Sequence, residues 1–235
     1  MEKTIVVTGG SQGIGRAIIL HFAANGFAVA TCARTAKDLQ VLEKEVLRLA
    51  PNQPHLFSVC DMRDKKQVLQ FAKEVLALWT HIEIIVNNAG VFLPGQVINE
   101  EEGILEKLIE TNLYSAYYFT RAFVPQLLKA KQGHVFNMCS IASLQAYPNG
   151  GSYSISKFAL LGFSKALREE MKPHNIRVTS ILPGATLTAS WAGVDIPAAR
   201  LMKAEDVAKA VFAVYSLSEN TVVEDIVLRP ILGDL

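Results

Sequence analysis

Tyr153 and Lys157 are the two residues whose types and spacing best suit proton transfer in this sequence. Residues four apart lie on one face of a helix, and the run 150–152 just before them is typical of a helix start. A free tyrosine has a pKa of about 10, so it works as an acid or base near neutrality only where a neighbouring cation stabilises the phenolate. The lysine ammonium would be that cation, although a tyrosine and a lysine at this spacing are more often a plain surface pair.

Ser140 could polarise a carbonyl group beside that pair. It follows an apolar run, residues 133–139, that is typical of a buried strand, so its hydroxyl is expected at the carboxyl edge of a sheet. A hydroxyl there can donate a hydrogen bond to a carbonyl oxygen that gains negative charge during reduction. Serines after strands also cap turns, which is the alternative role. The three residues together suggest carbonyl chemistry, provided that the rest of the chain holds them and a hydride carrier in one place.

A cofactor site is indicated near the start of the chain, in a glycine-rich turn. The β-branched run 4–8 leads directly into this turn, and a helical pattern over 16–25 follows it. Glycines allow a tight turn and close backbone approach, and the start of a helix offers free N–H groups and a positive dipole to a pyrophosphate. The spacing differs from the GxGxxG fingerprint, so a glycine turn without a ligand is the alternative. The residues expected to contact the pyrophosphate are Gly9, Ser11, Gln12, Gly13, Ile14 and Gly15.

Arg34 is expected to select the cofactor. The run 27–33 is typical of a second strand, and Arg34 follows its end. At this position an acidic residue would hydrogen-bond the 2′-hydroxyl of NAD, whereas an arginine nearby would pair with the 2′-phosphate of NADP. The sequence therefore favours NADP(H) over NAD(H). The alternative is an exposed arginine that only starts a loop.

The chain is predicted to fold as one α/β domain over residues 1–235. Its residues are 50% hydrophobic, which suffices for one large core. Helical segments alternate with about seven apolar runs, which predicts a Rossmann fold: a parallel, doubly wound sheet with helices on both faces. Such sheets bind ligands at the carboxyl ends of their strands, so the glycine turn, Arg34 and Ser140 should meet in one crevice. The predicted strands span 4–8, 27–33, 55–60, 82–86, 133–139, 175–182 and 222–228, and the predicted helices span 16–25, 37–49, 65–78, 100–131, 153–172 and 204–216.

Composition argues against several other classes of protein. The formal net charge is +1, from 23 basic and 22 acidic residues, so nothing indicates binding to nucleic acid or to an anionic membrane surface. There is no charged leader and no apolar run long enough to cross a bilayer, so a cytoplasmic protein is expected. The three cysteines, Cys32, Cys60 and Cys139, lack the paired spacing of a zinc site. They are expected to be reduced core thiols, and no metal is predicted.

Taken together, these motifs resemble those of the short-chain dehydrogenase/reductase family, and the resemblance covers essentially the whole chain. Each motif is weak alone, but in this order and register the set is highly specific. The matching motifs are Thr8 to Gly15, Asp61, Asn87 to Gly90, Asn112, Ser140, Tyr153 with Lys157, and Pro183 with Gly184.

The resemblance implies a catalytic set of four residues. Tyr153 would protonate the carbonyl oxygen during reduction, and Ser140 would orient and polarise that carbonyl. Lys157 would lower the pKa of the tyrosine and bind the nicotinamide ribose, and Asn112 would hold a water that links Lys157 to solvent. Hydride would pass between the nicotinamide and the carbonyl carbon without a metal. A homodimer or homotetramer packed through the helices that contain Asn112 and Lys157 is also implied.

The same resemblance implies further contacts with the cofactor. Asp61 and Asn88 would contact the adenosine half, and Thr188 would contact the nicotinamide or the phosphates. The other expected contacts are Ala89, Gly90, Tyr153, Lys157, Pro183, Gly184 and Thr186.

The substrate is expected to be a small carbonyl compound or alcohol. The chain lacks the Thr-Gly-Gln strand and the Val-Asp-Gly-Gly tail of 3-oxoacyl carrier-protein reductases, and its ending over 221–230 is more similar to sepiapterin-reductase-like and small hydroxy-acid dehydrogenase members. Sepiapterin-like compounds, diketones and hydroxy acids are therefore the candidates. The segment 185–203 has mixed composition and is expected to be a substrate loop. The residues expected to line a mostly apolar pocket are Phe92, Leu93, Ile141, Ala142, Gln145, Tyr147 and Trp191.

Two other functions remain open. A 3-oxoacyl-acyl-carrier-protein reductase would need a basic rim for its acidic partner. The residues that could form such a rim are Lys129, Lys131, Arg168 and Lys172. These basic residues could equally well belong to ordinary solvent-exposed helix faces. The second possibility is a regulatory or scaffold protein that binds NADP without turnover, which would need none of the proton-transfer groups.

Overall fold

Seven parallel strands form one sheet in the computed structural model, which describes residues 3–191 and 193–234. The strand order is β3-β2-β1-β4-β5-β6-β7, and every neighbouring pair is parallel. The predicted doubly wound α/β sheet is thereby confirmed. The strands are β1 (Thr4–Thr8), β2 (Ala28–Ala33), β3 (His55–Val59), β4 (Ile84–Asn87), β5 (Gly133–Met138), β6 (Ile176–Pro183) and β7 (Asp225–Leu228).

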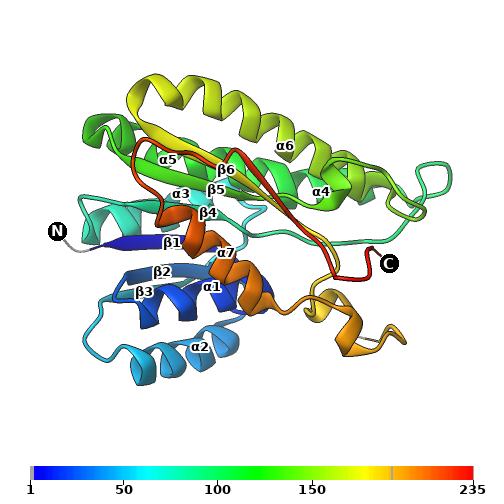
Figure 1. Cartoon of the computed structure of the whole chain (residues 1–235), viewed down its shortest axis with the longest axis horizontal. Coiled ribbons are helices and arrows are strands. Elements are labelled where there is room, and N and C mark those ends of the chain that lie inside the picture. Colours follow the sequence, from blue (N-terminus) through cyan, green and yellow to red (C-terminus); the bar gives the residue numbers. More distant parts are fainter. Residues whose placement is uncertain (1–2, 192, 235) are drawn as a thin grey trace.

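Helices cover both faces of this sheet (Figure 1). Buried side chains of α1, α2 and α7 pack in one core cluster, and those of α3, α5 and α6 pack in a second cluster on the opposite face. Strand β1 serves both clusters, because Ile5 and Val7 point to the first and Val6 to the second, as alternate residues of a strand must. The helices are α1 (Gly13–Ala24), α2 (Ala36–Leu49), α3 (Lys65–Leu78), α4 (Ile104–Ile109), α5 (Ser115–Ala130), α6 (Gly151–Met171) and α7 (Ala204–Tyr215).

The predicted helix over 100–131 is interrupted and begins later than expected. Glu100 lies in an irregular segment, and α4 begins only at Ile104. Between α4 and α5 the chain forms a π-helical turn, Glu110–Tyr114, which contains Asn112. A hydrophobic pattern does not reveal one extra residue in a helical turn, and π-turns are frequent at functional sites.

The crevice of the fold lies where the strand order reverses. β1 pairs with β2 on one side and with β4 on the other, so the connections after these strands leave in opposite directions. In open α/β sheets this switch point is the usual ligand site. The glycine turn after β1, Arg34 after β2, Asn88 after β4 and Ser140 after β5 all reach this edge of the sheet.

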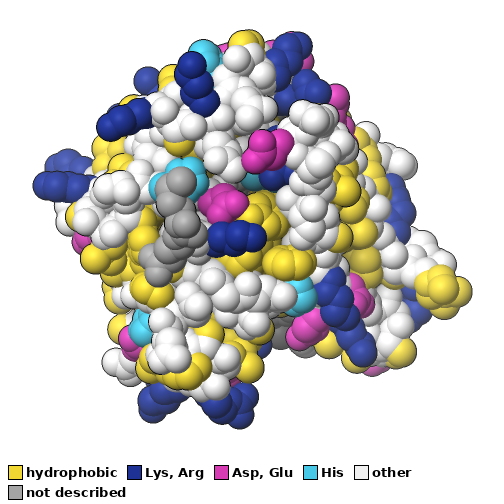
Figure 2. Space-filling model, turned by 60° about the vertical axis from the view of Figure 1, so that its left-hand side comes forward, with side chains coloured by type: hydrophobic (Ala, Val, Ile, Leu, Met, Phe, Trp, Pro, Cys, Tyr) yellow, Lys and Arg dark blue, Asp and Glu magenta, His cyan; other side chains and the backbone are white. Residues whose placement is uncertain are grey.

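The surface shows no single dominant charge on the face drawn in Figure 2, where basic and acidic side chains are interspersed. Within the described ranges, no helix is both long enough and apolar enough to span a lipid bilayer.

Candidate active site

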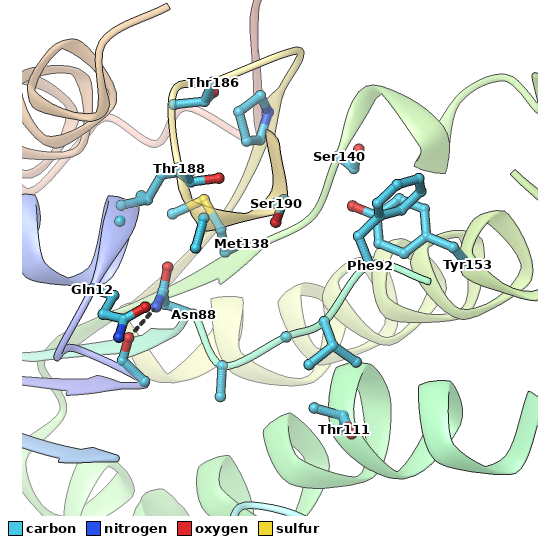
Figure 3. A pocket seen from close by; sticks show the side chains of 18 of the residues that line it. Gln12, Asn88, Phe92, Thr111, Met138, Ser140, Tyr153, Thr186, Thr188 and Ser190 are labelled. Atoms are coloured by element: carbon cyan, nitrogen blue, oxygen red, sulfur yellow. Dashed lines mark hydrogen bonds between the residues drawn. The ribbon is translucent and has the colours of Figure 1, made fainter. Parts of the chain in front are cut away.

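A cleft of about 640 Å³ lies at the carboxyl ends of the strands. Figure 3 shows Gln12 and Asn88 at one end of it and Ser140, Phe92 and Tyr153 at the other. All of the predicted catalytic and cofactor residues line this cleft except Gly15 and Asn112, and all of the predicted substrate residues line it except Leu93 and Ala142. Residues from distant parts of the chain therefore meet in one place, as the strand-end argument predicts.

The glycine turn leaves the start of α1 open to the cleft. Gly9 has a φ of +67°, and its N–H donates to the carbonyl oxygen of Cys32 at 3.0 Å, which folds the turn back onto β2. Gln12 makes no side-chain cap at the start of α1, and the first turn of this helix carries no acidic residue. No carboxylate within the first turn offsets the positive dipole end of α1, and its N–H groups can receive a phosphate. These residues fit the pyrophosphate of a dinucleotide.

Gly15 does not line the cleft but packs against the glycine turn and Asn88. A Cβ atom at this position would overlap the side-chain nitrogen of Asn88 and would lie 2.5 Å from the carbonyl oxygen of Gly9. The same Asn88 nitrogen donates to the carbonyl oxygens of Thr8 at 2.9 Å and of Gly9 at 3.0 Å. Asn88 thus holds the turn in place while it also lines the cleft.

Gly15→Ala is expected to destabilise the protein by about 1–3 kcal/mol, because the neighbouring backbone must move to admit the methyl group. Gly162→Ala is the matched control, since Gly162 is exposed within α6 and no atom lies within 4 Å of the added Cβ. Alanine there should stabilise the protein by about 0.5–1 kcal/mol. Denaturant unfolding measures both changes, and equal free energies of unfolding for the two variants would contradict the packing around Gly15.

The expected adenosine end of the cleft carries two arginines, Arg34 and Arg63. The Nη2 of Arg63 donates to Asp61 Oδ2 at 2.6 Å, and its Nε lies 3.1 Å from each carboxylate oxygen. This contact is the main cause that lowers the pKa of Asp61, and the charge of Arg34 adds to it. The side chain of Asp64, and not that of Asp61, caps the start of α3. The Asp61 carboxylate is therefore available to bind Arg63. Arg63 was not predicted from the sequence. The only feature that could have indicated it is its position as a basic residue shortly after the end of a strand.

The Ser140 hydroxyl caps a turn and still has a hydrogen to donate. Its Oγ accepts from the N–H of Ala142 at 3.1 Å, and the N–H of Ser140 donates to the Oγ of Ser143 at 3.2 Å. This reciprocal cap starts a 3₁₀ turn, Ile141–Ser143. Because the Ser140 oxygen serves as the acceptor, its O–H can donate to the phenol of Tyr153 or to a substrate oxygen. The capping role and a catalytic role are therefore compatible.

Tyr153 brings its phenol to Ser140 from the first turn of α6 (Figure 3). Burial raises the pKa of this phenol above its ordinary value of 10, and hydrogen bonding with Ser140 opposes the shift. Phe92 packs edge-on against the ring, with the two ring centroids 4.9 Å apart. The phenol is therefore protonated at neutral pH and can donate a proton to a carbonyl oxygen.

In the described structure, Lys157 lies within cation–π distance of the Tyr153 ring but makes no hydrogen bond to its hydroxyl. Its Nζ donates to the carbonyl oxygen of Met138 at 2.8 Å and lies 5.9 Å from the centroid of the Tyr153 ring. Burial lowers the pKa of the lysine to about 8. The four-residue spacing does put both side chains on one face of α6, but the desolvated ammonium bonds to the carbonyl at the end of β5.

Asn112 lies behind the cleft, fully buried in the π-helical turn. Its Oδ1 accepts from the N–H of Val91 at 2.8 Å, and its Nδ2 donates to the Val91 carbonyl at 3.0 Å and to the Oγ of Ser156 at 2.9 Å. That Ser156 hydroxyl in turn donates to the carbonyl oxygen of Tyr153 at 2.7 Å. The side chain of Asn112 thus connects the segment after β4 to the first turns of α6.

The expected substrate end of the cleft is mostly apolar. The segment 185–203 borders it and contains two 3₁₀ turns, Ala189–Trp191 and Ala198–Arg200; Ala192 in this segment lies outside the described residues. Arg229 and Asp234, which pair with each other, also line the cleft and were not expected from the sequence. The lining residues with aromatic, aliphatic or amide side chains include Phe92, Ile141, Gln145, Tyr147 and Trp191, as expected. Leu93 and the fully buried Ala142 were also expected there, but they do not line the cleft.

Known proteins with the same sequence features are oxidoreductases. The family model described as short chain dehydrogenase matches residues 3–196. A sepiapterin reductase of Chlorobaculum tepidum is 31% identical in an alignment that covers 100% of this chain and 99% of that protein. An alcohol dehydrogenase from the archaeon Thermococcus sibiricus, solved with 5-hydroxy-NADP, superposes with a TM-score of 0.93 at 26% identity and covers 100% of this chain and 99% of its own.

A metagenomic short-chain oxidoreductase solved with NADP superposes with a TM-score of 0.83 at 29% identity, over 97% of this chain and 96% of its own. The family model spans most of the chain, and the sepiapterin reductase aligns with it from end to end. The chain therefore belongs to the short-chain dehydrogenase/reductase family of oxidoreductases.

Proposed function

We propose that this protein is an NADP(H)-dependent oxidoreductase that transfers a hydride between the nicotinamide and a small carbonyl or alcohol substrate. One observation carries the proposal: a single cleft holds Ser140 and Tyr153, and it also receives the uncapped start of α1 and Arg34. Proton-transfer groups and a phosphate-binding helix start therefore face the same space. The NADP-type ligands in two related structures support a nicotinamide cofactor here.

The residues of this chain would supply positioning and a proton. A bound NADPH would be the source of the hydride for the carbonyl carbon. Ser140 donates a hydrogen bond to the carbonyl oxygen, and Tyr153 protonates that oxygen as negative charge develops on it. The ammonium of Lys157 has two N–H groups beyond the one that Met138 accepts, so it could bind the nicotinamide ribose. Its charge would stabilise the phenolate after proton transfer. The water relay expected at Asn112 stays a prediction.

A small, largely apolar carbonyl compound fits the substrate end best. Aromatic and aliphatic side chains surround Ser140 and Tyr153 there, with Gln145 as an amide that could select a polar substituent. The end-to-end similarity to a sepiapterin reductase favours a sepiapterin-like compound, and diketones and hydroxy acids are the other candidates.

The 3-oxoacyl carrier-protein reductase is the weaker alternative. In the described structure, none of the four basic residues considered for a docking rim lines the cleft. Two of them are already in ion pairs, Arg168 with Glu224 at 2.5 Å and Lys172 with Glu169. A rim whose charges are partly compensated attracts an acidic carrier protein less well.

Arg34→Asp tests the cofactor preference. The variant should raise the KM for NADPH by about 10–150-fold and that for NADH far less, because a charge-assisted pair with the 2′-phosphate contributes about 1.5–3 kcal/mol. Initial rates at varied cofactor concentration measure both constants. Equal losses for NADPH and NADH would remove Arg34 from the 2′-phosphate.

The proposal as a whole is tested by NADPH oxidation with a panel of sepiapterin, a diketone, a short 3-oxoacyl thioester and a 3-oxo acid. Fastest turnover of sepiapterin or the diketone is the expected result, whereas fastest turnover of the thioester would establish the alternative. Tight NADPH binding without turnover of any compound would favour the regulatory or scaffold protein.

We also propose that the chain works as a homodimer or homotetramer. Large apolar side chains stand exposed near α5 and α6, namely Tyr114, Tyr117, Ile155 and Phe158. Burial of such a face between copies would remove them from water. Light scattering on the purified protein measures the mass, and a monomer at all concentrations would contradict the proposal. Cytoplasmic location stays a prediction from the sequence.

A further inference from the structure

The start of α6 is capped by a carboxylate from a distant segment. Gly150, at the N-cap of this helix, makes no side-chain cap, and no acidic residue lies in the first turn. Instead, Glu100 accepts from the backbone N–H of Ser152 at 2.8 Å with Oε1 and from the Ser152 hydroxyl with Oε2. Ser152 is 3% exposed, so its two donor groups are buried, while the Glu100 side chain that accepts from them is half-buried. A carboxylate at this end also offsets the positive dipole of the helix.

The backbone around this cap is packed too closely for any residue but glycine. A Cβ on Gly151 would overlap Oε1 of Glu100 and would lie 2.6 Å from the carbonyl oxygen of Gly95. The N–H of Gly95 donates to the Asn149 carbonyl at 3.0 Å, and the Gln96 side-chain nitrogen donates to the Asn149 side-chain oxygen, also at 3.0 Å. Residues 95–100 and 149–152 therefore form one joined unit, which we call the α6 clamp.

The α6 clamp lies directly before the phenol in the chain. Tyr153 follows Ser152, so the position of the Ser152 backbone sets where the Tyr153 side chain begins. The segment that carries Glu100 also carries Phe92, whose ring contacts the Tyr153 ring. The segment after β4 thus holds the tyrosine at two points, the ring and the preceding backbone.

We propose that Glu100 is a positioning residue for the reaction: by capping α6 at Ser152, it holds the Tyr153 phenol in register with Ser140. The inference rests on the proposed function, because it takes Tyr153 as the acid. Glu100 does not line the cleft, so it acts through the tyrosine and not by contact with substrate or cofactor.

Three variants test this role. Glu100→Ala removes the cap, and kcat should fall about 10–100-fold, as expected for a misplaced catalytic group, while the KM for NADPH stays nearly unchanged. Glu100→Gln should keep most of kcat, because its carbonyl oxygen can accept from the Ser152 N–H and its amide can donate to the Ser152 hydroxyl. Asp64→Ala is the matched control. It removes a carboxylate cap from the start of α3, where Asp64 accepts from the N–H groups of Lys66 and Gln67.

Thermal unfolding separates positioning from general stability. Glu100→Ala and Asp64→Ala should both lower Tm by about 2–4 °C, as the loss of one cap does in a protein of this size. Only Glu100→Ala should lower kcat. The inference is overturned if Glu100→Ala keeps full kcat, if Glu100→Gln loses as much as the alanine variant, or if Asp64→Ala loses kcat to the same degree.

The same measurements keep the two proposals apart. If Tyr153→Phe is inactive while Glu100→Ala is fully active, Tyr153 remains the proposed acid and the positioning role of Glu100 is wrong. If Tyr153→Phe is fully active, the proposed acid itself is wrong, and Glu100 has no catalytic group to position.

Discussion

Tyr153→Phe is expected to lower kcat by about 10²–10⁴-fold, which is the usual contribution of a positioned general acid. Phenylalanine keeps the ring that Phe92 contacts and removes only the hydroxyl that hydrogen-bonds with Ser140. The fold and the cofactor end of the cleft should therefore stay intact. Steady-state turnover of the best panel substrate measures the loss, and the fluorescence of bound NADPH should show nearly unchanged affinity.

Tyr117→Phe is the matched control for this change. Tyr117 lies on α5 outside the cleft, where its hydroxyl accepts a hydrogen bond from Arg121 at 2.9 Å. Because this hydroxyl lies outside the cleft, its loss should leave kcat as it is. Full activity in Tyr153→Phe, or an equal loss in both variants, would show that the Tyr153 phenol is not the acid.

Lys157→Met should have the second large effect, which combines lost turnover with a stability change that depends on pH. Methionine keeps an unbranched side chain in the buried site and removes the ammonium, so the proposed contact with the ribose and the charge near the Tyr153 ring would both be lost. The folded protein holds this lysine at a pKa of about 8, against 10.5 for the free group. Each pKa unit corresponds to about 1.4 kcal/mol, so the buried ammonium destabilises the wild type by up to about 3 kcal/mol below pH 8.

The sign of this effect follows from proton binding. Below pH 8 both the folded and the unfolded wild type bind the lysine proton, so the destabilisation is fully present. Between pH 8 and 10.5 only the unfolded state keeps the proton, so the stability of the wild type rises relative to that of Lys157→Met.

Denaturant unfolding of both proteins at pH 7 and at pH 10 measures the difference. Lys73→Met, at an exposed position of α3, should show no such change with pH. A constant difference between wild type and Lys157→Met at both pH values would contradict the burial of the ammonium.

The central strands were predictable because burial on both faces leaves a continuous apolar run. Strand β1 has the predicted bounds, 4–8, and all its residues are buried. β7 lies at the edge of the sheet and is only partly covered, so the predicted run 222–228 includes three residues before the strand starts at Asp225. The π-helical turn at Asn112 was not predictable, because one extra residue in a turn leaves the apolar pattern nearly unchanged.

The site was predictable as far as it depends on strand ends and short spacings. Ser140 and Tyr153 could be placed in one crevice because one follows a strand and the other starts a helix. Partners of individual polar groups could not be predicted, since each depends on a segment distant in the sequence. The ammonium of Lys157 bonds to the carbonyl of Met138, and the carboxylate of Glu100 bonds to Ser152, 52 residues further along the chain.

Transfer of deuterium from NADPH that carries deuterium in place of both hydrogens on the reactive nicotinamide carbon tests the central claim most directly. The wild type should place the label on the former carbonyl carbon of sepiapterin or the diketone, as mass spectrometry of the product would show. Tyr153→Phe should bind the labelled cofactor and yield almost no labelled product. Product formed without the label, or no product from any carbonyl in the panel despite bound NADPH, would contradict hydride transfer as the function of this cleft.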